Sequence, residues 1–298
     1  MQKRRTATVE WRTLGAITGC YALWALGVFV LPPVSLPLAV IVTALAAAFH
    51  SSLTHEVIHG HPFRSARLNA ALVAPPLVLA VPFLRFRDTH LAHHNDARLT
   101  DPYDDPESNY MDGGDWEARP GWYQGLRRIN NTLAGRLLIG PALGQVMWMA
   151  ADLRAIRAGD GAVLRGWLWH LPGLALVLAV VAVSPMPLWA YLPAAYAALS
   201  LLKIRTFLEH RAHERAPGRT VVIEDRGPLA LLFLNNNLHL VHHMHPRAPW
   251  YALPGLYRAN PDRYLGRNEG YRYTSYGEVF RRYFWRAKDP VPHPIWRR

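Results

Sequence analysis

The chain has 298 residues, a formal net charge of +12 and a single cysteine, Cys20. One cysteine excludes an intramolecular disulfide, a self-contained iron–sulfur cluster and a cysteine-built zinc site. Hydrophobic residues make up 51% of the chain and are concentrated in long apolar runs. We therefore interpret the positive charge first as that of a membrane protein, before considering nucleic acid as a partner. We find no helix-turn-helix, zinc-finger or RNA-binding signature, and nucleic acid is therefore not expected as a partner.

Four apolar segments are close to the length of roughly 17–25 residues that a membrane-crossing helix needs. The first follows a basic N-terminus and ends in Leu31-Pro32-Pro33 without a small-residue cleavage site, which predicts a signal-anchor helix rather than a cleaved signal. The segments form two close pairs and therefore predict two helical hairpins. The predicted spans are 14–31, 34–54, 166–183 and 187–204.

The distribution of basic residues predicts how these spans are oriented. The short turns at 32–37 and 184–187 contain no Lys or Arg, whereas the termini and the histidine-bearing segments are rich in them. The positive-inside rule then places both termini and all histidine clusters in the cytoplasm. We expect one all-α domain over 1–298, a multi-pass protein of the inner (cytoplasmic) membrane with four transmembrane helices in two hairpins and a cytoplasmic helical cap carrying the histidines.

Two further apolar segments, 68–84 and 132–150, are not expected to cross the membrane. The first contains three prolines, and each removes a helix hydrogen bond that lipid cannot replace. A crossing there would also separate the first two histidine clusters onto opposite faces of the membrane. We interpret 68–84 as re-entrant or interfacial, and 132–150, which Arg136 and Pro141 interrupt, as an interfacial helix.

The histidines carry the main functional signal, because they recur in three clusters with helical spacing. Residues three and four apart share one face of a helix, so each cluster presents two or three imidazoles in one direction. Neutral imidazole binds iron, copper, zinc and nickel, and eight rings exceed the four ligands of one tetrahedral zinc, so the pattern predicts two metal ions. The clusters are His55 and His59; His90, His93 and His94; and His239, His242 and His243.

Other histidines are weighed against simpler interpretations. His210 lies just past the last predicted span and is favoured as a ninth ligand, whereas His213 is either an alternative ligand or part of a solvated helix face. His61 is off the face of the first cluster and is expected beside the site or at the surface. The string from His55 to His59 also fits the zinc-protease motif, but that interpretation leaves the other clusters unexplained.

Polar residues near the second and third clusters offer supporting roles. An acidic stretch, Asp101 to Glu107, either orients the ligand histidines, contacts a polar head group or forms a proline-stiffened surface loop. One of three consecutive asparagines, 235–237, is expected to hydrogen-bond a ligand or to cap a helix. Of the remaining histidines, two are expected at the membrane interface and two at the protein surface; these are His50 and His170, and His245 and His293.

The three clusters, their order, their spacing and the four-span topology resemble the membrane fatty acid desaturase family, which includes related carotenoid ketolases and hydroxylases. The resemblance runs from about residue 34 to residue 255. It implies a non-haem di-iron centre that activates dioxygen and is ligated almost wholly by histidine. The eight cluster histidines match its ligands by position, and His210 matches an additional ligand. Where some relatives carry an asparagine one turn earlier, this chain has Thr206.

The expected reaction is desaturation or hydroxylation of an alkyl chain of a fatty acid or lipid, since zinc lacks the redox chemistry that breaking such a C–H bond needs. A carotenoid ketolase or hydroxylase and an oxidase of a small alkyl metabolite remain alternatives with the same chemistry. A membrane metal transporter is the alternative from another class. Transport needs ligands along a path within the bilayer, however, whereas the histidine clusters lie outside the predicted spans. We find no nucleotide fingerprint or fused haem motif, so a separate ferredoxin-like electron carrier is expected to dock on the basic cytoplasmic face.

Overall fold

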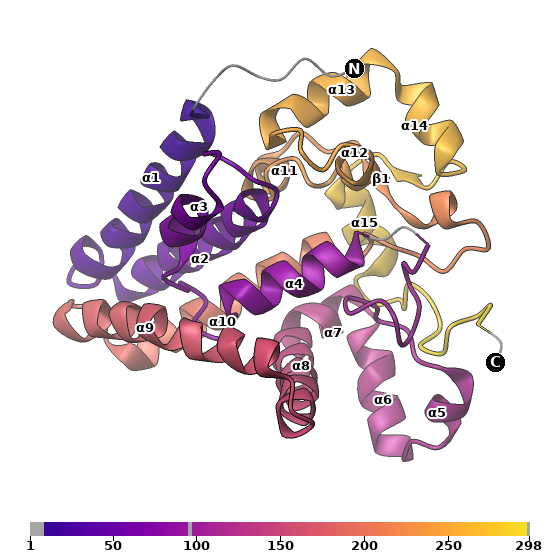
Figure 1. Cartoon of the computed structure of the whole chain (residues 1–298), viewed down its shortest axis with the longest axis horizontal. Coiled ribbons are helices and arrows are strands. Elements are labelled where there is room, and N and C mark those ends of the chain that lie inside the picture. The colour runs from indigo at the N-terminus through magenta and orange to yellow at the C-terminus, as the bar shows by residue number, and fades with distance from the viewer. Residues whose placement is uncertain (1–8, 95–96, 297–298) are drawn as a thin grey trace. The chain divides into compact units, whose positions relative to one another are not determined.

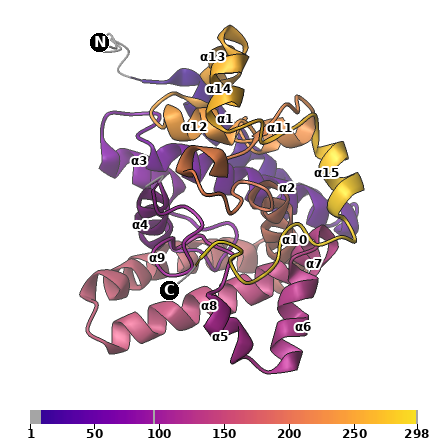
Figure 2. The same ribbon diagram turned by 90° about the vertical axis from the view of Figure 1, so that its right-hand side faces the viewer.

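The computed structural model describes residues 9–94 and 97–296, so three basic residues of the predicted signal anchor, Lys3, Arg4 and Arg5, lie outside the described residues. The chain is predominantly helical (Figures 1 and 2) and divides into two compact units. The first unit comprises Met1–Arg85 and Asp160–Ala198, and the second comprises Phe86–Gly159 and Leu199–Arg298. That residues 1–298 form one domain stays a prediction.

The first unit is built from long apolar helices. Two helices run across its boundaries, because α4 and α10 each begin in the first unit and end in the second. The elements that begin in this unit are α1 (Trp11–Ala25), a π-helical turn (Leu26–Val30), α2 (Leu36–Ile58), α3 (Ala66–Val73), α4 (Phe83–His93), α9 (Gly161–Val183) and α10 (Leu188–Thr206).

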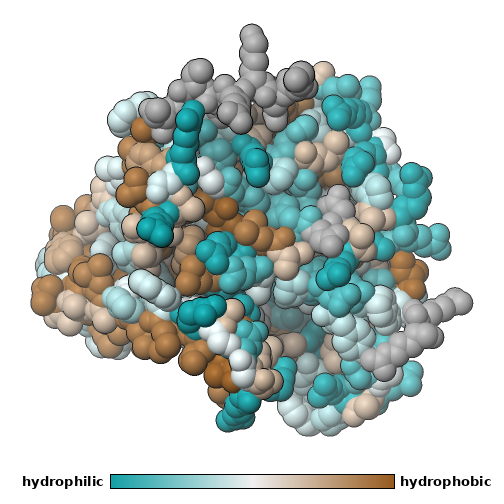
Figure 3. Space-filling view, viewed as in Figure 1, coloured by the Kyte–Doolittle hydropathy of each residue, from teal (hydrophilic) through white to brown (hydrophobic). Residues whose placement is uncertain are grey.

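Three helices of the described residues are long and apolar enough to cross a membrane: Trp11–Val30, Leu36–Ile58 and Gly161–Val183. They coincide with three predicted spans, with ends shifted by a few residues. Hydrophobic residues gather on the surface where α1 and α9 lie (Figure 3). The fourth predicted span, 187–204, forms helix α10, but α10 is not among these three helices, and it carries Lys203 and Arg205 near its end. The four-span arrangement therefore stays a prediction.

Helices α1 and α2 approach closely where the first hairpin turns. A Cβ atom on Gly27 would lie 2.5 Å from the Thr43 hydroxyl oxygen, so only glycine fits between the two helices. Ser35 begins α2 by accepting a hydrogen bond from the backbone N–H of Leu38. The Ser35 cap therefore marks the start of the second helix of this hairpin.

The proline-containing segment 68–84 is not one helix. Helix α3 ends at Val73 and α4 begins at Phe83, with an irregular stretch between them. Carbonyl groups in or beside this stretch accept hydrogen bonds from long side chains of neighbouring helices, which removes the cost of burying an unpaired carbonyl. The donors are Tyr21 to Leu72 O (2.7 Å), Tyr191 to Leu77 O (2.9 Å) and His170 Nε2 to Leu79 O (2.7 Å).

These contacts give His50 and His170 partners that the sequence did not reveal. His170 donates to the irregular stretch, and the His50 ring lies 3.2 Å from the Tyr21 hydroxyl. Several backbone groups of the stretch are hydrogen-bonded to protein groups, which is what irregular structure at membrane depth requires. This supports the re-entrant interpretation of 68–84, which stays a prediction.

The second unit consists of shorter helices and one small parallel sheet, in which Val222 pairs with Arg272 and Ile223 with Tyr273. The predicted interfacial segment 132–150 falls on α7 and α8. The elements that begin in this unit are α5 (Gly113–Glu117), α6 (Gly121–Asn130), α7 (Leu133–Leu138), α8 (Gly140–Arg157), a 3₁₀ turn (Ala216–Arg219), β1 (Val222–Ile223), α11 (Pro228–Leu232), α12 (His239–Met244), a 3₁₀ turn (Trp250–Ala252), α13 (Leu253–Ala259), α14 (Pro261–Arg267), β2 (Arg272–Tyr273) and α15 (Tyr276–Tyr283).

Strand β1 fixes the start of α12. Backbone hydrogen bonds join Leu240 N to Val221 O (3.0 Å) and Ile223 N to Asn237 O (2.8 Å). An apolar core lies beneath α12, so the helix is held by both backbone pairing and burial. The core residues are Val222, Leu238, Leu240, Val241, Leu253, Tyr257 and Tyr264.

Candidate metal centre

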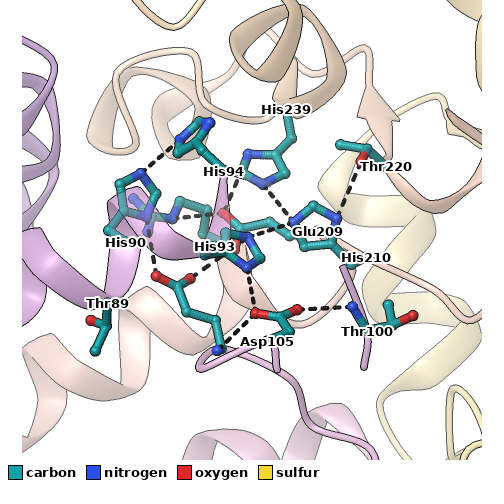
Figure 4. Close-up of polar contacts among 12 residues, drawn as sticks. Thr89, His90, His93, His94, Thr100, Asp105, Glu209, His210, Thr220 and His239 are labelled. Atoms are coloured by element: carbon teal, nitrogen blue, oxygen red, sulfur yellow. Dashed lines mark hydrogen bonds and ion pairs between the residues drawn. The ribbon is translucent and has the colours of Figure 1, made fainter. Parts of the chain in front are cut away.

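Two helices of the second unit present the same pattern of histidines. On α4, His90 and His93 are buried while Leu91 and Ala92 between them are exposed. All three histidines of the third cluster are buried on α12. The predicted sharing of one helix face is therefore confirmed for His90 and His93 on α4, whereas on α12 the residues between the histidines are buried as well. The rings of His90, His93, His94 and His239 lie close together in Figure 4.

Four imidazoles of the second unit form one group. The Nε2 atom of His210 lies 2.8 Å from Nε2 of His93 and 3.1 Å from Nε2 of His239. The ring of His243 completes the group, with its centroid 4.6 Å from that of His239. Each of these side chains offers a ligand atom, and all four atoms lie within 4.8 Å of one another. His210, predicted from its place after the last span, is thus brought together with the second and third clusters.

The remaining three histidines of these clusters form a second group. The Nε2 atom of His94 lies 3.0 Å from that of His90 and 3.2 Å from that of His242. The two groups use rings from both α4 and α12, so each helix divides its histidines between two positions. This is the arrangement that two neighbouring ions would require.

The first cluster lies in the other unit, at the end of α2. His55 is in the last turn and is buried, and His59 caps the helix. Their ring centroids are 5.0 Å apart, which confirms the one-turn spacing predicted for this pair.

His61 and His213 have other surroundings. His61 Nδ1 lies 2.8 Å from a carboxylate oxygen of Glu10. His213 lies beside the carboxylate of Glu269, 3.3 Å from Nε2, and its side chain is one quarter exposed. No described interaction joins His213 to either histidine group of its own unit. His293, expected at the surface, is instead buried, with only 8% exposed.

Carboxylates accept hydrogen bonds from the Nδ1 atoms of two rings of the second cluster. His93 Nδ1 donates to Asp105 Oδ1 (2.8 Å) and His90 Nδ1 donates to Glu107 Oε1 (3.1 Å). Asp105 is itself fixed, because its oxygens accept hydrogen bonds from the backbone N–H groups of Thr100 and Glu107. The orienting role considered for the acidic stretch is therefore confirmed for Asp105 and Glu107.

Neutral groups contact the Nδ1 atoms of two further rings, those of His239 and His210. His239 Nδ1 donates to Asn236 Oδ1 (3.1 Å), and Asn236 in turn donates to Glu209 (3.3 Å), which confirms that one of the three asparagines bonds a predicted ligand. His210 Nδ1 lies 3.2 Å from the Thr220 hydroxyl (Figure 4). Thr220 was not singled out from the sequence, because it has no motif and follows His210 after a loop.

The charges around the two helices differ. Burial lowers the pKa of His93, but the carboxylates of Glu107 and Asp105 outweigh it and raise the pKa to about 9. Burial, reinforced by neighbouring histidines, holds the pKa of His210 and of His239 well below the usual value. Those two rings are therefore neutral, which is the form in which imidazole binds a metal.

The donor set fits bound metal ions. His210 and His239 are neutral and can each direct an Nε2 lone pair at a cation, whereas the raised pKa of His93 lets its Nε2–H donate to His210 when no metal is bound. A bound cation would take the place of that proton. Two nitrogens at right angles around an ion, each at about 2.1 Å, are separated by about 3.0 Å. The observed Nε2 separations of 2.8–3.2 Å match that value.

A small polar cavity of about 50 Å³ adjoins the first group and is lined by His93, His210, Glu107, Glu209 and Thr206, among others. The Thr206 hydroxyl is buried there without a hydrogen-bond partner among the described residues. A water in such a cavity needs two to four polar partners, and these side chains supply them. Thr206 therefore places a hydroxyl beside the group at the position where some relatives carry an amide.

A family model described as fatty acid desaturase matches residues 7–275 of the chain. The match covers all three histidine clusters and both units. None of the curated proteins compared with the chain matches it.

Proposed function

Because the chain belongs to the fatty acid desaturase family, we propose that it is a dioxygen-dependent, di-iron membrane enzyme that desaturates or hydroxylates an alkyl chain of a fatty acid or lipid. Membership makes the protein an oxidoreductase of lipid-like substrates, and its three apolar helices make it a membrane protein. The observation that carries the finer proposal is the convergence of imidazole Nε2 atoms whose Nδ1 atoms are already engaged.

We assign the metal ligands residue by residue from the family pattern. His93, His210, His239 and His243 form one set, which their geometry within the second unit supports. His90, His94 and His242 belong to the other set, supported by their Nε2 separations. The assignment of His55 and His59 to that second set rests on their sequence match alone.

The bound iron pair would supply the activation of dioxygen and the removal of hydrogen from an unactivated carbon. Desaturation then balances as –CH2–CH2– + O2 + 2 e⁻ + 2 H⁺ giving –CH=CH– + 2 H2O. Hydroxylation balances as R–H + O2 + 2 e⁻ + 2 H⁺ giving R–OH + H2O. Both outcomes need two electrons from outside the substrate, and a separate ferredoxin-like carrier is proposed as their source.

The protein side chains orient and insulate this centre. Asp105 and Glu107 fix the rings of His93 and His90, and Asn236 fixes the ring of His239. Burial of these rings, with at most 3% of His90, His93 and His239 exposed, keeps bulk water from the Nε2 atoms. A rigid set of ligands with engaged Nδ1 atoms favours a resident metal over a transported one.

We also propose the cellular arrangement. The enzyme is a multi-pass protein of the inner membrane, with termini and histidine clusters in the cytoplasm, and its alkyl substrate enters from the bilayer. The basic character of the histidine-bearing segments supports this orientation.

The test is a comparison of lipids, by mass spectrometry, from host cells with and without the chain. The expected result is a new double bond or hydroxyl group on an acyl chain. His242→Ala should remove the product and lower the iron content of the purified protein. An iron-replete, active His242→Ala would contradict the proposal, and an oxidised carotenoid or small alkyl metabolite as the only product would redirect it to those substrates.

His213→Ala is the matched control. It makes the same substitution in a histidine that lies beside Glu269 rather than in either group. Its iron content and product level should equal those of the unchanged protein.

A further inference from the structure

Helices α13 and α14 pack against α12 and carry a basic surface. The proposed reaction does not itself use this surface. Four arginines on and before α13 and α14 are exposed, and we call them the α13–α14 arginine surface: Arg247, Arg258, Arg263 and Arg267. Between residues 244 and 268 the only acidic residue is Asp262. Hydrophilic residues dominate the molecular surface where α13 and α14 lie (Figure 3).

The arginines at the centre of this surface are not neutralised locally. Neither Arg258 nor Arg263 forms an ion pair with a described residue, in contrast to Arg272 and Arg282, which pair with Glu224 and Glu278. Two neighbouring arginines without an ion pair are unfavourable to the fold by themselves, because their charges repel one another. They are favourable for attracting an acidic partner.

Helix α14 is also connected to a predicted metal ligand, His243. Tyr264 on α14 is buried, and its hydroxyl lies 3.1 Å from Nε2 of His245. His245 is the C-terminal capping residue of α12 and lies two residues beyond His243. One hydrogen bond and a short stretch of backbone therefore join α14 to the histidine group that contains His243. The exposed Arg263 directly precedes the buried Tyr264, so α14 carries both part of the charged surface and this connection.

We propose that the α13–α14 arginine surface is the docking site of an acidic one-electron carrier protein, and that electrons pass by way of Tyr264 and His245 toward His243. The inference rests on the proposed function, whose reaction consumes two electrons per turnover. Two reduced carrier molecules are each oxidised by one electron, and dioxygen is the species reduced. Weak, charge-steered encounters of this kind need only a small interface.

Docking is tested on the full-length protein in lipid nanodiscs with an acidic plant-type [2Fe–2S] ferredoxin as the probe. Binding is measured at low and at physiological salt. The double substitution Arg258→Glu/Arg263→Glu should weaken binding by about tenfold or more, since steering by charge changes association rates by 10–10³. The neutral pair Arg258→Gln/Arg263→Gln should give an intermediate loss, and added salt should reduce the differences.

Arg281→Glu/Arg286→Glu is the matched control, because it makes the same change of charge at two exposed arginines at and beyond the end of α15. At physiological salt, binding by this control should stay within about twofold of the unchanged protein, because charges more than about 8 Å from the docked partner are largely screened. An equal loss in both double variants, no loss in the first, or no binding by the unchanged protein would overturn the docking site.

Product formation driven by dithionite separates this inference from the proposed function. All variants should form product in a single turnover when they are reduced anaerobically with dithionite, freed of the excess reductant and then given dioxygen, since a small reductant does not need the arginine surface. Product with dithionite but equal ferredoxin binding by both double variants would sink the docking site alone. Absence of product with every reductant would sink the proposed function, while the binding measurements would still judge the docking site.

Discussion

Helices α4 and α12 carry the same string, His-x-x-His-His, yet the protein holds the two sets of rings by different means. Carboxylates of Asp105 and Glu107 accept from the α4 rings, whereas the amide of Asn236 accepts from His239 on α12. As a result the pKa of His93 rises to about 9, while burial keeps that of His239 well below its usual value. The two identical motifs therefore differ in the charge of the groups that accept hydrogen bonds from their rings. We expect the loss of each accepting group to lower iron affinity by a different amount.

The largest effect is expected on the α4 side, from Asp105→Asn. An asparagine cannot accept at both oxygens, so its amide nitrogen would face either the His93 ring or the backbone N–H of Thr100. Loss of such a supporting carboxylate costs about 10–100-fold in metal affinity or activity. Iron titration of the purified protein and product formation both measure this loss.

Asp104→Asn is the control for that prediction. Asp104 is exposed in the same loop and has no contact with a histidine of either group. If the two substitutions reduced iron affinity equally, the carboxylate would be acting through the charge of the loop and not through the ring of His93.

A smaller effect is expected on the α12 side, from Asn236→Ala. The substitution removes a neutral acceptor from His239 Nδ1 and leaves Glu209 Oε1 at 3.7 Å from the same atom as a replacement acceptor. Iron affinity should fall by less than about tenfold, because a neutral hydrogen bond contributes about 0.5–1.5 kcal/mol. An effect larger than that of Asp105→Asn would break the contrast between the two helices.

The smallest effect is expected from Thr220→Val, which keeps the side-chain shape and removes the hydroxyl beside His210 Nδ1. The expected loss in iron affinity is a few-fold, about that of one neutral hydrogen bond. Thr220→Ser retains the hydroxyl and should restore the affinity. Failure of serine to restore it would show that the methyl group, rather than the hydroxyl, positions His210.

The sequence was sufficient to predict which histidines of the second unit come together, because residue type and helical spacing together carry that information. It also indicated the stretches that contain Asp105, Glu107 and Asn236, since each stretch lies close to a histidine cluster, but it did not single out these residues. It could not indicate Thr220, whose contact with His210 depends on a loop that returns beside β1. Long-range contacts of single polar residues leave no periodic signal.

The membrane helices were predictable to a similar degree. Apolar length located three spans and helix α10, but Lys203 and Arg205 at the end of α10 reduce its apolar character. The three prolines of 68–84 predicted a break in helical structure. The groups that satisfy this break, Tyr21, Tyr191 and His170, come from helices distant in sequence and were visible only in the folded chain.

Mössbauer spectroscopy of the purified, ⁵⁷Fe-loaded protein tests the central claim most directly. Two imidazole groups divided between α4 and α12 predict two iron ions per chain, coupled to each other through their proximity. A spectrum of one isolated iron, or a preparation that binds only zinc while still forming product, would contradict the account.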